Sequence, residues 1–371
     1  MRHFNNLTDD ERKKIFFIEP KYYKRDCKID INSYLLGASL YIPAVKDNIF
    51  KSIIKLKNKD LMSVIICLED AVGEQEIEYA KMNLYKNIEK LYLAIKEWGI
   101  ELDDIPFIFI RVRYQKQMTE IVKILQKYMK LINGFVFPKF TAENGSEYFE
   151  TLVEINKGLN RKLYAMPILE TSEIIHLESR KRELENLRLL LKKYKDLVLN
   201  LRIGATDFSG LYGIRRNNNM TIYDIKVVAD CIKDILNMFL RVENEYVISG
   251  VVWEYFAGEN KLDKLNGKDI ETLVKEIIMD KYNGFVGKTI IHPSHIRTVN
   301  SLYVVTYEEY LDAYSILDSV GKSGVIKSKF SNKMNEIKPH SSWAKRILKR
   351  ADIYGVFNEE YDYRDLLRKG I

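Results

Sequence analysis

The chain has 371 residues, of which 46% are hydrophobic and 30% are charged, as is typical of a globular protein with a substantial core. No apolar stretch approaches the ~20 residues of a membrane-spanning helix. The three cysteines lie too far apart for a disulfide framework or a zinc site. Lys and Arg (59) outnumber Asp and Glu (52), which gives a net charge of +7. The sequence shows no cluster of basic residues interleaved with aromatic ones, the pattern typical of a nucleic-acid-binding face. We therefore expect a cytoplasmic protein that binds small anions and has no nucleic-acid or membrane partner.

Short apolar runs alternate with longer amphipathic segments along most of the chain. The runs favour buried parallel strands because they are largely apolar rather than alternating. The charged segment His176–Asn200 is expected to form a helix outside the sheet, with an oligomer contact as the alternative. The expected strands are Ser39–Pro43, Val64–Leu68, Phe107–Val112, Gly134–Pro138, Leu163–Leu169, Leu201–Ala205, Val247–Val252 and Phe285–Ile291. The other expected helices include Lys46–Leu56, Gln75–Trp98, Met118–Leu131, Glu143–Leu159 and Tyr223–Phe239.

Eight strand–helix units predict an α/β fold, a (β/α)8 TIM barrel, which takes about 250 residues. An open doubly wound sheet is the alternative, but no Gly-rich phosphate-binding turn follows the first strand. We expect the catalytic barrel to span residues 35–301, with an N-terminal extension (1–34) packed on it. Residues 302–371 are expected to form a C-terminal helical extension, with helices at Tyr307–Val320 and Ser342–Ile353, that serves as a lid or an oligomer contact.

Polar side chains stand at the carboxyl end of nearly every expected strand. In a barrel these ends face one rim, so the side chains are expected to meet at one pocket. A helix cap or a surface ion pair explains any single one of them, but not so many together. We expect His292 to hydrogen-bond the rim backbone rather than to bind a metal. In chain order these residues are Glu69, Asp70, Arg111, Arg113, Lys139, Glu170, Asp207, Glu254 and His292.

Glu170 and Asp207 are the most informative of these residues. Each follows a short apolar run, Leu163–Leu169 or Leu201–Ala205, so each carboxylate is expected at the pocket. Two carboxylates from separate strands hold a hard divalent cation and leave open positions for a substrate. Capping of the following helix is the plainer explanation for either acid alone.

Six motifs occur in order along the chain, and together they resemble the HpcH/HpaI aldolase and citrate lyase beta-subunit-like superfamily. Gly37–Ala44 and Asn332–Ala344 are similar to one branch of it, the predicted carbon–carbon bond lyases of the TIM-barrel fold, often associated with bacterial stress-response clusters. The six motifs are Cys67-Leu-Glu-Asp-Ala-Val72, Ile110-Arg-Val112, Gly134-Phe-Val-Phe-Pro-Lys139, Pro167-Ile-Leu-Glu-Thr171, Ile203-Gly-Ala-Thr-Asp-Phe208 and Gly284-Phe-Val-Gly-Lys-Thr-Ile-Ile-His-Pro293.

The resemblance implies a lyase that depends on Mg²⁺ (or Mn²⁺) and cleaves or condenses a small oxo- or hydroxy-acid, in many relatives a coenzyme A thioester. It also implies a homo-oligomer, a trimer or hexamer, in which a C-terminal segment closes a neighbour's site. The implied roles are metal ligation by Glu170 and Asp207, contact with the substrate carboxylate or enolate by Arg111, and catalytic lining of the pocket by Glu69, Asp70 and Lys139.

This chemistry also follows from elementary considerations. Cleaving a bond beside a carbonyl leaves an enolate, which is a transient negative charge on oxygen. A metal held by two carboxylates chelates an oxo- or hydroxy-acid and polarises the reacting oxygen. The guanidinium of Arg111 adds a fixed positive charge that deprotonation cannot remove.

The chain departs from the family pattern at three places. Gly37-Ala38 stands where many relatives have Arg-Ser, Cys67 replaces an Asp, and Arg113 replaces an Asn. These changes weaken the case for a coenzyme A thioester and leave the metal pair intact. Because Cys67 has no expected base or helix N-terminus beside it, we interpret it as a packing residue rather than a nucleophile.

Four further residues are candidates for substrate binding. Arg113 ends the third strand, and Arg215 and Arg216 lie in a loop shortly after Asp207, where they would bind a phosphate or a second carboxylate. A solvated turn is the equal alternative for that pair. Trp253 is expected either to form an apolar wall for the substrate or to belong to the core.

Three hypotheses for function therefore stand. The first is the metal-dependent lyase. The second is a class II pyruvate aldolase that acts on a sugar-like or phosphorylated substrate. The third is a barrel that binds an anionic metabolite without turning it over and acts in regulation. The combination of Glu170, Asp207 and Arg111 favours turnover, since simple binding does not require a site that stabilises an enolate.

Overall fold

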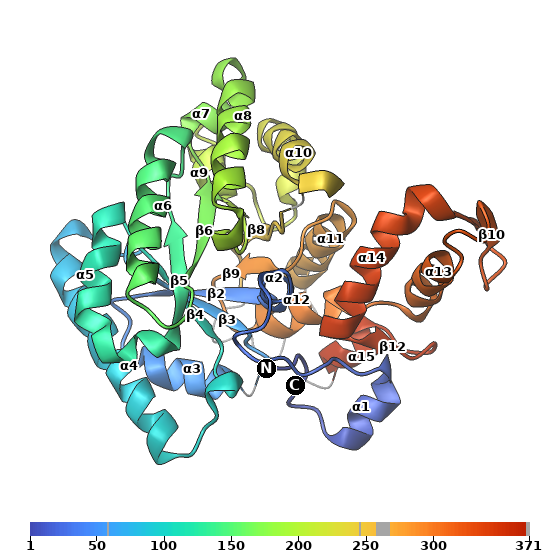
Figure 1. Ribbon diagram of the computed structural model, residues 1–371, viewed down its shortest axis with the longest axis horizontal. Helices are drawn as coiled ribbons and strands as arrows, with labels where there is room; N and C mark the ends of the chain where they lie inside the picture. Colours follow the sequence, from blue (N-terminus) through green and yellow to red (C-terminus); the bar gives the residue numbers. More distant parts are fainter. Residues whose placement is uncertain (58, 245, 257–267, 369–371) are drawn as a thin grey trace.

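Eight parallel strands form the centre of the computed structural model, which describes residues 1–57, 59–244, 246–256 and 268–368 (Figure 1). Their order in the sheet is β7-β6-β5-β4-β3-β2-β9-β8. Leu201 closes the ring from β7 to the segment before β8, where its N–H lies 2.8 Å from Val247 O. The TIM barrel and all eight expected strands are confirmed. The strands are β2 (Ala38–Pro43), β3 (Ser63–Cys67), β4 (Phe107–Arg111), β5 (Ile132–Phe137), β6 (Tyr164–Leu169), β7 (Arg202–Ile203), β8 (Gly250–Trp253) and β9 (Lys288–Ile290).

The strands form because their side chains are buried on both faces, one towards the barrel interior and one towards the helices. Every residue of β3, β4 and β5 is buried. Gly134 in β5 lies so close to β6 that a Cβ atom there would stand 1.9 Å from Tyr164 O. This glycine therefore sets the close approach of the two strands.

Helices cover the outside of the barrel (Figure 1). The expected helix Met118–Leu131 is α-helical only as far as Leu125 and continues as a 3-10 turn, and the segment His176–Asn200 is α-helical only to Lys193. The α-helices of this layer are α3 (Ile49–Lys57), α4 (Ile77–Glu97), α5 (Gln115–Leu125), α6 (Ala142–Lys157), α7 (Ser172–Ile175), α8 (Leu177–Lys193), α9 (Ala205–Gly210), α10 (Lys226–Phe239), α11 (Lys268–Tyr282) and α12 (His295–Tyr303). The 3-10 turns are η1 (Glu74–Glu76), η2 (Leu102–Asp104), η3 (Gln126–Leu131), η4 (Lys195–Leu197), η5 (Ile222–Asp224) and η6 (Val242–Asn244).

The two ends of the chain pack against each other as well as on the barrel. Strand β1 pairs antiparallel with β12, with Phe16 opposite Phe357. Helices α13 and α14 stand to one side of the barrel (Figure 1) and share a small core of their own that includes Ile316 and Ile347. The elements of the two ends are α1 (Asp9–Ile15), β1 (Phe16–Ile18), α2 (Ile29–Leu35), α13 (Tyr307–Asp318), β10 (Val325–Lys327), β11 (Met334–Glu336), α14 (Ile337–Tyr354), β12 (Val356–Phe357) and α15 (Tyr363–Arg368).

Helix α14 packs at the amino end of the barrel, opposite the rim where the strands end. Tyr354 donates to Tyr34 O in α2 at 3.0 Å, and Arg346 donates to Leu240 O at 3.1 Å. Helix α2 leads into the amino end of β2, and Leu240 follows α10 on the way to β8. Helix α14 therefore lies away from the rim, and the role of the extension as a lid or as a segment that closes a neighbour's site stays a prediction.

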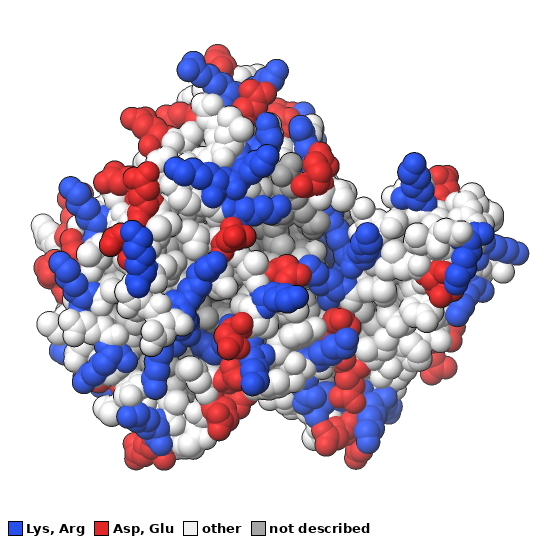
Figure 2. Space-filling model, viewed as in Figure 1, with Lys and Arg blue, Asp and Glu red and all other residues white. Residues whose placement is uncertain are grey.

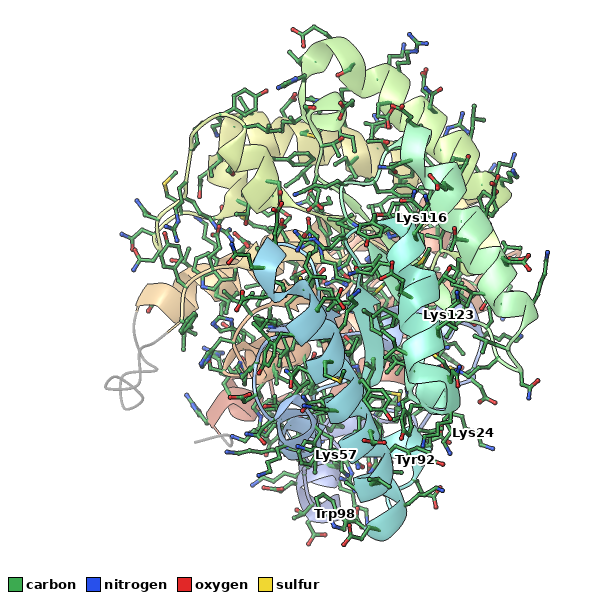
Figure 3. The ribbon with its side chains drawn as sticks, turned by 90° about the vertical axis from the view of Figure 1, so that its left-hand side faces the viewer. Lys24, Lys57, Tyr92, Trp98, Lys116 and Lys123 are labelled. Carbon is green, nitrogen blue, oxygen red and sulfur yellow. The ribbon has the colours of Figure 1, made fainter. Side chains whose placement is uncertain are left out.

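The surface mixes charges of both signs. In the view of Figure 2, acidic and basic side chains are interspersed. Figure 3 shows the face formed by α4 and α5, where Lys116, Lys123, Lys24 and Lys57 are spread along the whole face. Trp98, near the end of α4, is 56% exposed on this face. Among the described residues, no helix combines the length and the apolar character that crossing a membrane requires.

Candidate functional site

A cavity of about 200 Å³ opens where the barrel strands end. The charged residues that line it belong to four strands or to the segments after them, namely β3, β4, β6 and β7. Because parallel strands all end at one rim, residues distant in sequence meet here. The residues that carry the argument are Asp70, Arg111, Glu170, Arg202, Gly204 and Asp207.

Arg111, the last residue of β4, is the centre of this charged cluster. Its Nη2 lies 2.8 Å from Glu69 Oε2, 3.1 Å from Asp70 Oδ2 and 3.1 Å from Glu170 Oε1. The side chain of Arg111 is only 9% exposed and that of Glu170 only 2%. One guanidinium is therefore held in a fixed direction by three carboxylates from two other strand ends.

Burial and neighbouring charges shift the ionisation of these groups. Burial, with a smaller contribution from the charge of Asp207, raises the pKa of Glu170 to about 7 against the opposing effect of Arg111. Burial also raises the pKa of Glu69. Burial alone would raise the pKa of Asp70, but a hydrogen bond with Glu69 and the charge of Arg111 outweigh it, so this pKa is lowered. The acidic groups around Arg111 raise its pKa in spite of its burial, so it stays charged.

Lys139, two residues after β5, connects the two acids expected to bind a metal. Its ammonium forms an ion pair with Asp207 and lies 3.7 Å from Glu170 Oε1. Its backbone N–H donates to the same Glu170 oxygen at 2.8 Å. The backbone of Lys139 has φ 47°, which is uncommon for a residue other than glycine. Backbone strain of this kind is often found at functional sites. A cation therefore already lies between the two carboxylates.

The donor set fits a hard divalent cation. Glu170 and Asp207 offer carboxylate oxygens, which Mg²⁺ prefers, and Mg²⁺ usually keeps water and substrate oxygens as its other ligands. The ammonium of Lys139 marks the place between them as favourable for positive charge. Within the described part of the chain, no group of three His, Cys, Asp or Glu side chains comes together as a metal cage. The pair is thus suited to a cation that the substrate helps to hold.

Replacing Lys139 with methionine is expected to raise Mg²⁺ affinity about tenfold, or about 1.4 kcal/mol, because the competing ammonium is gone. Turnover is expected to fall in the same variant. Calorimetric titration with Mg²⁺ measures the first effect. Lys157→Met is the matched control, since Lys157 is exposed on α6 and pairs with Glu154. Unchanged or weaker Mg²⁺ binding by Lys139→Met would contradict this competition.

Gly204, directly after β7, provides the space for Glu170. A Cβ atom at this position would lie 2.3 Å from Glu170 Oε2 and 2.4 Å from Glu170 Cβ. Any larger residue must therefore displace the carboxylate.

The Gly204→Ala variant is expected to lose at least tenfold in Mg²⁺ affinity and about 1–3 kcal/mol of stability through overpacking. Mg²⁺ titration and thermal unfolding measure the two effects. Gly210→Ala is the control, because a Cβ atom there meets nothing within 4 Å. Equal Mg²⁺ affinity in the two alanine variants would show that Glu170 does not need this space.

The four residues expected to bind substrate lie around the cavity rather than in its lining. Arg113 donates to Val72 O at 2.9 Å and so holds the loop after β3. Arg215 is exposed and borders a second cavity of about 300 Å³, which shares Thr206 with the first. Trp253 is 1% exposed, which fits the core alternative. Substrate contact by these residues stays a prediction.

Arg216 belongs to a buried charge network behind the rim. Its guanidinium pairs with Glu254 at 2.7 Å and with Glu276 of α11, and it lies 4.7 Å from the ring centre of Trp253. Lys288 of β9 lies 2.8 Å from Glu276 in the same network. The ion pair with Glu276 therefore connects the loop after α9 to α11.

Several residues that line the cavity escaped the sequence analysis, among them Arg202, Tyr41 and Thr289. Arg202 and Tyr41 point into the barrel from β7 and β2 and line the cavity. Arg202 is the one charged residue in the run Leu201–Ala205, which was a usable signal. Cys67 is buried, and burial raises the pKa of its thiol, which fits a packing role. His292 accepts a hydrogen bond from Ser294 N at 3.3 Å, the rim-backbone contact expected for it.

Solved structures share this barrel. CitE from Mycobacterium tuberculosis, in complex with magnesium, acetoacetate and coenzyme A, is 18% identical over 86% of this chain and 99% of its own, with a TM-score of 0.55. A citrate lyase from Burkholderia xenovorans is 14% identical over 90% of this chain and 96% of its own, with a TM-score of 0.64. At such low identity the likeness concerns the fold. No curated protein sequence matches the chain.

The sequence itself identifies the class of protein. A TIM barrel supports many chemistries, so the fold alone does not give the class. Residues 30–356 match the family described as C-C bond lyase of the TIM-barrel fold. The chain belongs to this family, which confirms the resemblance and the lyase class.

Proposed function

We propose that the protein is a Mg²⁺-dependent lyase that cleaves or forms a carbon–carbon bond next to the carbonyl of a small oxo- or hydroxy-acid. The observation that carries this proposal is the contact of Arg111 with Glu170 at 3.1 Å beside Asp207 at one cavity. This arrangement supplies a fixed positive charge and a pair of hard carboxylate ligands within one site. Both are what a reaction that develops negative charge on oxygen requires.

Glu170 and Asp207 would hold the metal. When bound, Mg²⁺ supplies Lewis acidity that polarises a carbonyl oxygen of the substrate. The chelating groups of the substrate would complete the coordination, which fits the two-carboxylate donor set.

Arg111 would orient the substrate and stabilise the charge that develops on it. Its guanidinium is fixed by Glu69, Asp70 and Glu170, so little reorganisation is needed when negative charge appears nearby. A bound carboxylate or developing oxyanion would replace part of the attraction that these acids now provide.

Glu69, Asp70 and Lys139 are the groups available to move a proton. Asp70 lies 3.8 Å from the ammonium of Lys139 and is half-exposed, so it faces the open side of the cavity. Cleavage beside a carbonyl needs a base for the hydroxyl proton and an acid for the carbon left behind. We assign the base to the Glu69–Asp70 pair and the acid to Lys139.

The form of the substrate divides the proposal further. CitE of M. tuberculosis was solved with coenzyme A, whereas Cys67, Gly37 and Arg113 of this chain depart from the pattern of thioester-using relatives. We therefore favour a free acid over a thioester.

A class II aldolase with a phosphorylated substrate is the second candidate. The observation in its favour is Arg215, which is exposed beside the second cavity, near the rim. A guanidinium there is available to a phosphate.

A turnover screen tests the proposal. The protein is incubated with Mg²⁺ and one of three substrate sets: free hydroxy-acids, their thioesters, or pyruvate with a phosphorylated aldehyde. The products are separated and identified by mass spectrometry. We expect cleavage of a free acid that stops when EDTA removes Mg²⁺ and returns when Mg²⁺ is restored. Turnover only with the aldehyde pair would favour the aldolase. Binding without any turnover would favour a regulatory barrel.

A further inference from the structure

Arg202 is a buried cation inside the barrel, below the rim. It is the first residue of β7, and its side chain points into the barrel and is only 1% exposed. It lines the same cavity as Arg111 and Glu170. A guanidinium in such a position requires an explanation, because removing a charge from water is costly unless it is paired.

The hydrogen-bond partners of Arg202 are all neutral. Its guanidinium donates to Thr289 Oγ1 at 2.7 Å, to Ser39 Oγ at 3.4 Å and to Asn200 Oδ1 at 3.5 Å, and lies 5.8 Å from the ring centre of Tyr41. Its Nε is buried without a hydrogen-bond partner. Among the described residues, no Asp or Glu forms an ion pair with it.

Two other cations near Arg202 are paired with carboxylates. Arg111 contacts three carboxylates, and Lys139 pairs with Asp207 and lies near Glu170. Burial lowers the pKa of Arg202, and the positive charge of Arg111 adds to this effect. The positive charge of Arg202 is therefore not balanced by a neighbouring carboxylate, unlike those of Arg111 and Lys139.

The position of Arg202 relative to the carboxylate pair follows from the strand. Gly204, against which Glu170 packs, directly follows β7 and lies two residues after Arg202. Two residues of a strand span ~7 Å. The backbone of Arg202 therefore lies ~7 Å further into the barrel than Gly204 and the carboxylate pair beside it. Arg202 and the carboxylate pair line the same cavity.

We propose that Arg202, with Thr289 and Tyr41, forms an anion subsite inside the barrel that takes a carboxylate of the substrate remote from the Glu170–Asp207 pair. This inference rests on the proposed function for the rim, and it adds a second point of recognition below it. The ligand class is a small acid with two carboxylates, one at the rim and one in the interior. An acid with an uncharged end would leave Arg202 unpaired.

A matched pair of ligands tests the subsite. Malate and 2-hydroxybutyrate share a hydroxy-acid head, and a methyl group of the second replaces the remote carboxylate of the first. With saturating Mg²⁺, we expect calorimetry on the wild type to give malate at least about 100-fold tighter binding, as for a buried charge pair. Equal affinity for the two acids would overturn the subsite.

Substitutions then assign the preference to Arg202. Arg202→Met is expected to weaken malate binding about 100-fold and to leave 2-hydroxybutyrate unchanged, whereas Arg202→Lys keeps part of the preference. Arg161→Met is the control, because Arg161 also donates to neutral groups, Lys130 O and Ile132 O, but at the amino end of the barrel. Equal weakening of both acids by Arg202→Met in a folded protein would also overturn the proposal. If Arg202→Met does not fold, the wild-type comparison and Arg202→Lys decide.

Failure of the subsite and failure of the proposed function are separable. A preference for malate that depends on Arg202, without Mg²⁺ binding or turnover, would support the subsite and refute the lyase mechanism. Mg²⁺-dependent turnover without a preference for the second carboxylate would do the reverse.

Discussion

Replacing Arg111 with lysine is expected to lower kcat by about 10²–10³-fold, the usual loss when one donor to a developing oxyanion is removed. Lysine keeps the positive charge but loses the planar group that contacts Glu69, Asp70 and Glu170 simultaneously. The loss should appear in kcat more than in KM, because the interaction strengthens as charge develops. Steady-state kinetics under saturating Mg²⁺ measures both parameters.

Arg180→Lys is the matched control for this experiment. Arg180 pairs with Asp230 and Asp234 between α8 and α10, outside the barrel, so its replacement should leave kcat within about threefold. The contradicting result is a folded Arg111→Lys variant with wild-type kcat, since the reaction would then not use this guanidinium.

Replacing Glu170 with glutamine is expected to reduce Mg²⁺ affinity by at least about 100-fold and to abolish measurable turnover. The substitution keeps the shape of the side chain and its ability to accept from Lys139 N, now donated to Glu170 Oε1 at 2.8 Å. It removes one of the two charged ligands, while the ammonium of Lys139 still competes for Asp207. Calorimetric Mg²⁺ titration and the turnover assay measure the two losses.

Glu173→Gln controls for the loss of one negative charge nearby. Glu173 is exposed in α7, one turn after Glu170, and should be replaceable without effect. If Glu170→Gln bound Mg²⁺ as tightly as Glu173→Gln does, the rim carboxylates would not be the metal ligands.

The barrel could be predicted from the sequence because parallel strands buried on both faces are largely apolar rather than alternating. The same reasoning predicted the position of the candidate rim residues. A charged residue at the carboxyl end of an apolar strand lies at the rim, where all the strands end. Glu170 and Arg111, 59 positions apart, accordingly meet at 3.1 Å.

Side-chain direction away from the strand ends could not be predicted in the same way. Arg215 and Arg216 are neighbours in a loop, yet one is exposed and the other is buried against Glu276. That difference depends on where α11 packs, which the loop sequence does not encode. Arg202 was overlooked because its direction depends on the strand's inward alternation, which a two-residue strand scarcely reveals.

The C-terminal extension shows a different limit. Its two long helices were expected, but α14 begins at Ile337, five residues before the expected start at Ser342. Ile337 packs in the small core between α13 and α14, so tertiary contact lengthens the helix beyond its local pattern. The position of α14 at the amino end of the barrel likewise follows from contacts with α2 that are distant in sequence.

The most direct test of the central claim is calorimetric titration of Mg²⁺ into the wild type and Asp207→Ala, with and without oxaloacetate. We predict that the wild type binds Mg²⁺, that oxaloacetate strengthens this binding because the acid completes the coordination, and that Asp207→Ala loses both effects. Failure of the wild type to bind Mg²⁺ with or without the acid would contradict a metal-dependent lyase at this rim.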